Sequence, residues 1–247
     1  MKAFSIEEIR DEIRLKEPVT NRSVSSNFGT VATPSDWDTV AWETSRLEKG
    51  TFRAKKILHL IPGEGLHLDV GTGNGDGTAL ISRYKKTVGV EYGQKSLLNA
   101  AKKGVLVYQA DARNLPFASD QFTSITCLDV LEHIQQPELA IREMARVLKG
   151  DGVLILQTPR KEEFKERLLA AVRKLKIVKQ KQPYDKPLAQ KKIRELLESE
   201  GFIVLEERPI RYWASNPLEH FISISRLFYC RLQKKHEGCN LKGVSTG

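Results

Sequence analysis

Glycine and acidic residues recur in this chain at spacings that suit a ligand rich in polar groups. The run Leu66 to Leu80 reads LHLDVGTGNGDGTAL: an apolar stretch ending in Asp69, then four glycines, then the start of an apolar helical segment. Glycine lets the backbone turn sharply and lets a ligand approach it, and the following helix N-terminus presents unpaired N–H groups. The run predicts a nucleotide-handling loop, although such a turn also serves as a simple strand-to-helix connection.

The glycine spacing differs from the dinucleotide-binding fingerprint G-x-G-x-x-G. Counted from Gly71 and Gly73, the third glycine of that fingerprint would fall on Asp76. The pattern D-x-G-x-G does fit, beginning at Asp69. A pyrophosphate is therefore not the expected ligand.

More polar residues stand where later strands are expected to end. Glu91 follows TVGV, 22 positions after Asp69 (91 minus 69), and can accept both hydroxyls of a ribose. Asp111, followed by Ala112, can accept the amino group of an adenine. Each carboxylate alone would also suit a helix cap, but the carboxyl ends of parallel strands meet at one edge of a sheet. Together they predict a nucleoside site.

The expected fourth strand ends in Leu128-Asp129-Val130-Leu131-Glu132-His133. His133 is the candidate general base because imidazole titrates near neutral pH. A histidine in this place can equally be structural, and the sequence leaves both roles open.

Apolar periodicity predicts an α/β fold in which strands and helices alternate. The expected strands are 66–69, 87–90, 105–109, 122–128, 153–157 and 202–206, and the expected helices are 79–84, 94–103, 138–148 and 188–199. Gly150-Asp151-Gly152 is expected to separate the third of these helices from the strand that follows.

Three helices are expected before the first strand, and the second of them, capped by Ser35, bears two tryptophans. Ser5 and Glu8 form a capping-box pattern, and Phe52 to Ile61 is helical up to Pro62. Trp37 and Trp42 either cover a ligand or pack on the core.

The composition is that of an ordinary globular protein. The 247 residues are 40% hydrophobic and 29% charged, and no apolar run approaches the ~20 residues of a membrane span. A cytoplasmic location is expected because the charged N-terminus lacks a signal-peptide pattern. Cys127, Cys230 and Cys239 fit neither a disulfide framework nor a metal site.

The net charge of +9 suits an anionic substrate, a membrane surface or nucleic acid, or only a solvated lysine-rich surface. Arg160 to Lys186 is the most basic stretch and reads as an amphipathic helix followed by a loop. Peripheral membrane contact, RNA contact and a solvated excursion over the sheet all fit it, and the last is favoured.

Five runs resemble the class I S-adenosylmethionine-dependent methyltransferases, and most of all the type 11 branch that includes the ubiquinone and menaquinone biosynthesis methyltransferases. They are DVGTGNG, VGVEYG, QADARNLPFASDQF, ITCLDVLEHI and EMARVLKGDGVLILQTP, spanning about Leu66 to Pro159, with weaker support from IRELLESEGFIVLEE. The resemblance implies a Rossmann-like, seven-stranded, mostly parallel sheet with helices on both faces and an antiparallel last strand near 227–232. Residues 1–62 would form a helical extension or lid, 63–235 the methyltransferase domain with a basic insertion at 160–187, and 236–247 a disordered tail.

The resemblance also implies a cofactor, S-adenosylmethionine, and a place for each matching residue. Gly71 and Gly73 would face the methionine part, Glu91 the ribose hydroxyls, Asp111 and Ala112 the adenine, and Leu128 the sulfonium, with Asp69, Thr72 and Tyr92 completing the set. No metal is implied. The acceptor pocket is expected from Trp37, Trp42 and the 160–186 region, which lie outside the resemblance.

The expected function is methyl transfer to a small-molecule or lipid-like acceptor by in-line displacement. Two alternatives remain, an RNA methyltransferase and a non-catalytic S-adenosylmethionine-binding protein. Amino methylation of a nucleic-acid base is disfavoured because no Asn-Pro-Pro-Tyr-like run follows the fourth strand.

Overall fold

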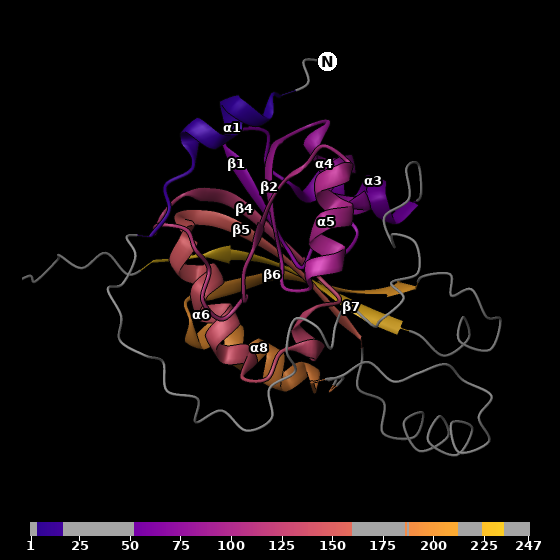
Figure 1. Ribbon diagram of the computed structural model, residues 1–247. Coiled ribbons are helices and arrows are strands. Elements are labelled where there is room, and N and C mark those ends of the chain that lie inside the picture. Colours follow the sequence, from indigo (N-terminus) through magenta and orange to yellow (C-terminus); the bar gives the residue numbers. More distant parts are fainter. Residues whose placement is uncertain (1–3, 17–51, 160–185, 187, 212–223, 235–247) are drawn as a thin grey trace, which may run out of the picture.

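The computed structural model describes residues 4–16, 52–159, 186, 188–211 and 224–234, and a seven-stranded sheet runs through them (Figure 1). The strands are β1 (Leu66–Val70), β2 (Lys86–Glu91), β3 (Leu106–Gln109), β4 (Phe122–Leu128), β5 (Leu148–Pro159), β6 (Phe202–Arg211) and β7 (Ile224–Leu232). Their order in the sheet is β3-β2-β1-β4-β5-β7-β6. The strands from β3 to β5 pair in parallel, whereas β7 is antiparallel to both of its neighbours. The predicted seven-stranded, mostly parallel sheet is confirmed.

Helices cover both faces of this sheet (Figure 1). On β5, Val153 and Ile155 pack against α3 (Phe52–Leu60) and α4 (Asp76–Ser82), where Ile57 and Ile81 complete the cluster. The alternate residues Leu154 and Leu156 belong to the larger core on the other face, with α6 (Pro137–Val147) and α8 (Gln190–Ser199). Because side chains alternate along a strand, burial on both sides explains the nearly continuous apolar runs in the sequence.

One junction differs from its prediction. The helix α6 ends at Val147 and β5 begins directly at Leu148, instead of after the Gly150-Asp151-Gly152 turn. Leu148 is fully buried and pairs with Phe122, and the next paired residues are Ser124 and Val153. The two glycines therefore lie within β5, at an irregularity in its pairing with β4. The burial of Leu148 keeps the start of β5 paired with β4.

The other elements lie within a few residues of their predicted bounds. The helix α5 (Gln94–Lys102) ends one residue early, α4 begins three residues earlier than predicted, and α8 begins two residues later. Both β6 and β7 are longer than predicted, because they pair with each other along nearly their whole length.

The N-terminal helix α1 (Ile6–Glu12) joins the main core. The predicted capping box is present: the Glu8 amide donates to Ser5 Oγ at 3.1 Å, and the Ser5 amide donates to Glu8 Oε2 at 2.9 Å. Ile9 is buried in the main cluster, and the Lys16 amide donates to the Pro116 carbonyl at 2.8 Å. The described start of the chain is thus fixed to the sheet, while the proposed lid role of 1–62 stays a prediction.

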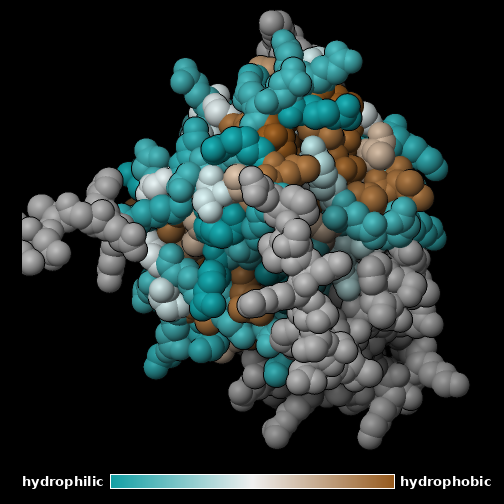
Figure 2. Space-filling view, turned by 60° about the vertical axis from the view of Figure 1, so that its left-hand side comes forward, coloured by the Kyte–Doolittle hydropathy of each residue, from teal (hydrophilic) through white to brown (hydrophobic). Residues whose placement is uncertain are grey.

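Several predicted features lie outside the described residues: Trp37 and Trp42, the basic stretch 160–185 and the tail from 236. Lys186 is described, and its amide donates to the Glu132 carbonyl at 2.9 Å. None of the helices that the structure describes is long and apolar enough to cross a membrane. On the face in Figure 2, hydrophilic residues surround the apolar ones.

We expect Gly75→Ala to destabilise the fold because of a close helix contact. Gly75 has φ +84°, and a Cβ there would lie 2.6 Å from the Ala100 Cα of α5. Strain at positive φ costs about 1–2 kcal/mol and overpacking about 1–3 kcal/mol more, so the free energy of unfolding should fall by roughly 2–5 kcal/mol. Urea denaturation measures the change.

Gly104→Ala is the matched control for that substitution. Gly104 has φ +73°, but a Cβ there would meet nothing within 4 Å. It should therefore show the backbone strain alone, about 1–2 kcal/mol. Equal losses in the two variants would contradict a packing role for Gly75.

Candidate functional site

The glycine loop lies across the carboxyl ends of β1 and β2. The amides of Gly71 and Thr72 both donate to the Val90 carbonyl, at 2.9 and 3.1 Å. Gly71 and Gly73 have φ +75° and +54°, the left-handed region that favours glycine. The sequence pattern thus produces a loop closed over two neighbouring strand ends, as predicted.

The glycines of this region do different things. A Cβ at Gly71 would lie 2.4 Å from Val130 Cγ2, and one at Gly89 of β2 would lie 2.3 Å from Thr72 Cγ2. These two glycines let the loop pack against β2 and the segment after β4. A Cβ at Gly73 would meet nothing within 4 Å. The main chain at Gly73 therefore borders open space, where a ligand can approach it.

Glu91 holds this loop from the end of β2. Its Oε2 accepts the Gly73 amide at 2.7 Å and its Oε1 accepts the Gly93 amide at 2.9 Å, and the residue is only 7% exposed. Burial raises the pKa of Glu91, the three backbone amides of Gly93, Gly73 and Tyr92 oppose the rise, and the nearby Asp69 adds to it. A carboxylate has about four acceptor positions, so lone pairs remain for ligand hydroxyls.

Asp69 anchors a buried chain of polar side chains beneath the loop. Its Oδ1 accepts the Thr126 hydroxyl and its Oδ2 accepts the Thr78 hydroxyl, both at 2.6 Å. Burial raises the pKa of Asp69, and these two hydroxyls partly offset the rise. The carboxylate thus joins β1 to β4 and α4, and its direct contact with a cofactor stays a prediction.

His67 extends the same chain. Its Nε2 lies 2.9 Å from Thr126 Oγ1 and its Nδ1 lies 2.8 Å from Ser124 Oγ. Because the single Thr126 proton goes to Asp69, Nε2 must donate to Thr126 and Nδ1 must accept from Ser124. Burial, with a smaller contribution from Lys85, lowers the pKa of His67 to about 3, so the ring is neutral. Sequence reasoning missed these residues, although polar side chains at alternate positions of apolar strands were a readable signal.

The end of β3 lies next to Glu91, since the Ala110 amide donates to the Glu91 carbonyl at 3.1 Å. There Asp111 pairs with Arg113: Oδ2 lies 2.6 Å from Nη2 and Oδ1 lies 3.0 Å from Nε. The Asp111 carboxylate raises the pKa of Arg113. Arg113, which the sequence reasoning overlooked, thus fixes the orientation of Asp111, the residue predicted to bind the adenine. Ala112 packs at the edge of the main core.

The end of β4 completes the site. Asp129, at φ +56°, accepts Gln157 Nε2 at 2.9 and 2.8 Å through its two oxygens, and the Ser225 hydroxyl lies 3.4 Å from Oδ1. Leu128 is half-buried beside it. His133 follows in a short 3-10 helix (Leu131–His133), with Nε2 3.7 Å from Glu132 Oε1.

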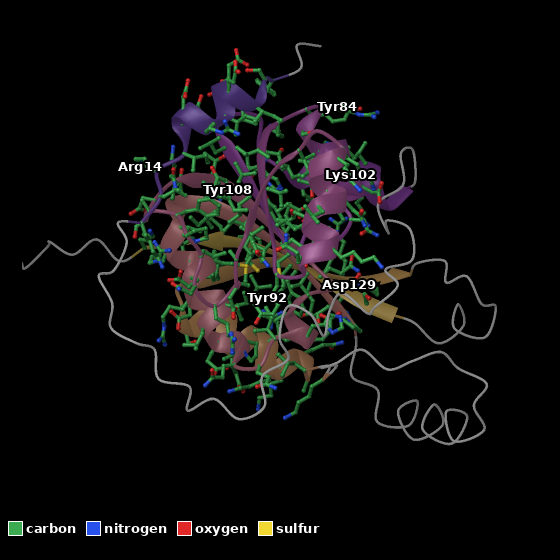
Figure 3. All side chains as sticks on the ribbon, in the orientation of Figure 1. Arg14, Tyr84, Tyr92, Lys102, Tyr108 and Asp129 are labelled. Atoms are coloured by element: carbon green, nitrogen blue, oxygen red, sulfur yellow. The ribbon has the colours of Figure 1, made fainter. Side chains whose placement is uncertain are left out.

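The predicted residues therefore gather at one edge of the sheet. In Figure 3, Tyr92 and Asp129 lie at the end of the strands opposite to Tyr84, which precedes β2. Gly71 is close to Val130, so the glycine loop and the β4 end adjoin. Within the described ranges there is no group of three or more His, Cys, Asp or Glu residues arranged to hold a metal. The donors and acceptors suit an organic ligand with hydroxyl, amino and carboxylate groups.

Comparison with known proteins gives a family for this edge. Residues 68–156 match the type 11 family model described as "Methyltransferase domain". An uncharacterized protein of Methanocaldococcus jannaschii is 29% identical over 147 residues, which cover 58% of this chain and 66% of that protein. The ubiquinone/menaquinone biosynthesis C-methyltransferase of Saccharophagus degradans is 35% identical over 101 residues, 36% of this chain and 41% of the relative. The chain thus spans less than two thirds of the length of these relatives.

A solved structure supports the fold. The phosphoethanolamine N-methyltransferase 2 of Haemonchus contortus, in complex with phosphomonomethylethanolamine and S-adenosylhomocysteine, superposes with a TM-score of 0.57 at 14% identity. The superposition covers 75% of this chain and 53% of that chain. At this identity it shows a shared fold.

Because His67 is buried and neutral, we expect the free energy of unfolding to depend on pH. The unfolded chain binds a proton at His67 near pH 6.5, whereas the folded chain does so only near pH 3. Between these values the unfolded state holds the extra proton, so the free energy of unfolding should fall as the pH falls through this window. Replacing His67 by Gln should reduce the slope by about one proton in urea denaturation between pH 7 and 4.

The matched control is His59→Gln, because His59 is an exposed histidine of α3. That variant should keep the wild-type slope. A His67→Gln variant with an unchanged slope would show that His67 does not stay neutral in the folded protein.

Proposed function

We propose that this chain, whose residues 68–156 form a class I, S-adenosylmethionine-dependent methyltransferase domain, transfers the cofactor's methyl group to a small-molecule or lipid-like acceptor by in-line displacement. The observation that carries the proposal is the buried Glu91 carboxylate, which fixes the glycine loop through Gly73 and keeps acceptor positions for ribose hydroxyls. The names of two similar proteins, a quinone-pathway C-methyltransferase and a phosphoethanolamine N-methyltransferase, support an acceptor of this kind.

The described residues fit the cofactor part by part. Glu91 would accept the ribose hydroxyls, and the open main chain at Gly73 would face the methionine part. Asp111, held by Arg113, and Ala112 would border the adenine. Leu128 would border the sulfonium. We also assign Asp69, Thr72 and Tyr92 to this site. Asp69 holds α4 in place, and Thr72 and Tyr92 lie in the loops that follow β1 and β2.

When bound, the cofactor supplies a methyl sulfonium that is already activated. The protein's part is to align a nucleophile behind the methyl group and to exclude water. If the acceptor must lose a proton, His133 is the proposed base, since it follows the end of β4. The peripheral membrane contact proposed for 160–186 concerns residues that, apart from Lys186, lie outside the described ranges.

A labelled-methyl transfer assay tests the proposal. The full chain is incubated with methyl-labelled S-adenosylmethionine and separate quinone, lipid, small-metabolite and RNA fractions. Label is expected in one of the first three fractions. Label in RNA alone would support the RNA methyltransferase alternative, and cofactor binding without any transfer would support a non-catalytic binding protein.

Replacing Glu91 by Ala should weaken S-adenosylmethionine binding by roughly 1.5–3 kcal/mol. The variant loses charge-assisted hydrogen bonds to the ribose and the fixed position of Gly73. Isothermal titration calorimetry measures the change, with Glu195→Ala on the exposed face of α8 as control and NAD as the competing ligand. An unchanged affinity, or a preference for NAD, would refute the assignment.

If the acceptor gives up a proton during transfer, replacing His133 by Ala should lower kcat by about 100-fold or more while cofactor affinity stays the same, because a positioned base contributes on that scale. An acceptor that needs no base would leave kcat unchanged. Turnover is measured with saturating substrates across pH, and the acidic limb of the profile should disappear. His59→Ala, on an exposed surface, is the control. Full turnover in the His133 variant would leave that residue with a structural role.

A further inference from the structure

Gln157, on β5, is a buried amide with half of its hydrogen-bonding capacity in use. The residue is fully buried, and its Nε2 is bonded to the Asp129 carboxylate at 2.9 and 2.8 Å. Its carbonyl Oε1 is buried and has no hydrogen-bond partner among the described residues. A buried acceptor without a partner is costly, about 1–3 kcal/mol, and a functional role is one explanation for such a group.

The orientation of this amide follows from its partner. Both oxygens of the Asp129 carboxylate accept hydrogen bonds, so the group that faces them must be the NH₂ and not the carbonyl. The backbone strengthens the arrangement, since the Asp129 amide donates to the Gln157 carbonyl at 2.8 Å. Oε1 is therefore held away from Asp129.

The position of Gln157 links it to the methyl-transfer point. In the parallel ladder between β4 and β5, Gln157 is the partner of Leu128, which would border the sulfonium. On the other side, Leu227 of β7 is its antiparallel partner, and Ser225 lies two residues earlier, within reach of Asp129. Gln157 thus lies near the carboxyl end of β5, between Leu128 of β4 and Leu227 of β7 in the sheet.

We propose that Gln157 binds the methyl acceptor by accepting a hydrogen bond at Oε1 from its reacting atom, that this atom is an amine nitrogen, and that Asp129 is the residue that positions Gln157. The inference rests on the proposed methyl transfer and adds the class of acceptor. An amide carbonyl accepts a hydrogen bond but does not take up a proton, so it suits a nucleophile that gains positive charge rather than one that must be deprotonated.

The transfer step is balanced for an amine. The nitrogen lone pair forms the new N–C bond, and the C–S bond breaks with its electron pair going to sulfur, which gives S-adenosylhomocysteine. The nitrogen becomes a methylammonium whose N–H keeps its hydrogen bond to Gln157 Oε1, and the proton leaves to water afterwards. The carbonyl dipole favours the growing positive charge, which is stabilisation in the transition state.

A first experiment identifies the methylated atom with wild-type protein. The full chain is incubated with S-adenosylmethionine carrying a ¹³C methyl group and a cell extract, and the ¹³C chemical shift of the product methyl shows whether it is bonded to nitrogen, oxygen or carbon. An N-methyl product is expected. An O-methyl or C-methyl product overturns the inference while the proposed methyl transfer stands. No labelled product, from protein that binds S-adenosylhomocysteine, refutes both.

A second experiment tests the residues. Gln157→Met keeps the side-chain length and removes the carbonyl, and Asp129→Asn removes the carboxylate that orients it. Each should lower kcat/KM for the identified amine by about 10- to 100-fold, the loss of one buried hydrogen bond, with S-adenosylhomocysteine affinity within about twofold. Asp120→Asn is the matched control, because Asp120 has nearly the same backbone, φ +57°, but lies on the exposed loop before β4.

The outcomes separate a binding role from a structural one. A structural role would lower cofactor affinity and the melting temperature in parallel with turnover. Wild-type kcat/KM in Gln157→Met overturns the role of Gln157, and wild-type kcat/KM in Asp129→Asn overturns the positioning role. If a variant does not fold, the ¹³C experiment still decides the class of acceptor.

Discussion

Two buried carboxylates on neighbouring strands, Asp69 and Glu91, set the character of this site. Each is less than a tenth exposed, burial raises the pKa of both, and their mutual repulsion adds to the rise for Glu91. Burying negative charge is costly unless donors surround it, and here hydroxyls hold Asp69 while loop amides hold Glu91. The arrangement favours a ligand that brings donors and positive charge, as S-adenosylmethionine does with its hydroxyls, ammonium and sulfonium. These two carboxylates disfavour a polyanion beside them, although the chain as a whole carries +9.

The position of the glycine loop depends on close packing at glycines, which have no Cβ atom, as much as on hydrogen bonds. Gly71 lies against Val130, Gly75 against Ala100, and Gly89 against Thr72, each closer than a side chain would allow. These contacts bring the loop onto β2, onto α5 and onto the segment after β4, so three elements fix it at once. Gly73 alone of these faces open space. Packing therefore decides where the loop lies, and one glycine is left for the ligand.

The gathering of the proposed cofactor residues at one sheet edge could be predicted from sequence because their positions follow from local structure. Glu91 ends β2 and Asp111 lies two residues after β3, and parallel strands necessarily bring their carboxyl ends to one edge. The polar side chains of Ser124, His67 and Asp69 at alternate strand positions were a readable signal, but which of them meet could not be foreseen, since that depends on the register between β1 and β4. The prediction of the α6–β5 junction was wrong for a similar reason. The local sequence favoured a glycine-rich turn, but the burial of Leu148 against β4 starts the strand before those glycines.

The part of the site proposed to bind the acceptor depends on contacts between residues far apart in the chain. Because β7 runs antiparallel, its first residues lie at the same edge as the last residues of β4 and β5. Ser225 thereby reaches Asp129, and Gln157 lies between Leu128 and Leu227. No spacing in the sequence encodes these long-range contacts. Motifs can therefore indicate the cofactor, but they do not indicate the acceptor. Under the proposed function, changing residues at this β4–β5–β7 edge would alter acceptor choice while leaving the glycine loop intact, so one fold could keep its methyl donor and vary what it methylates.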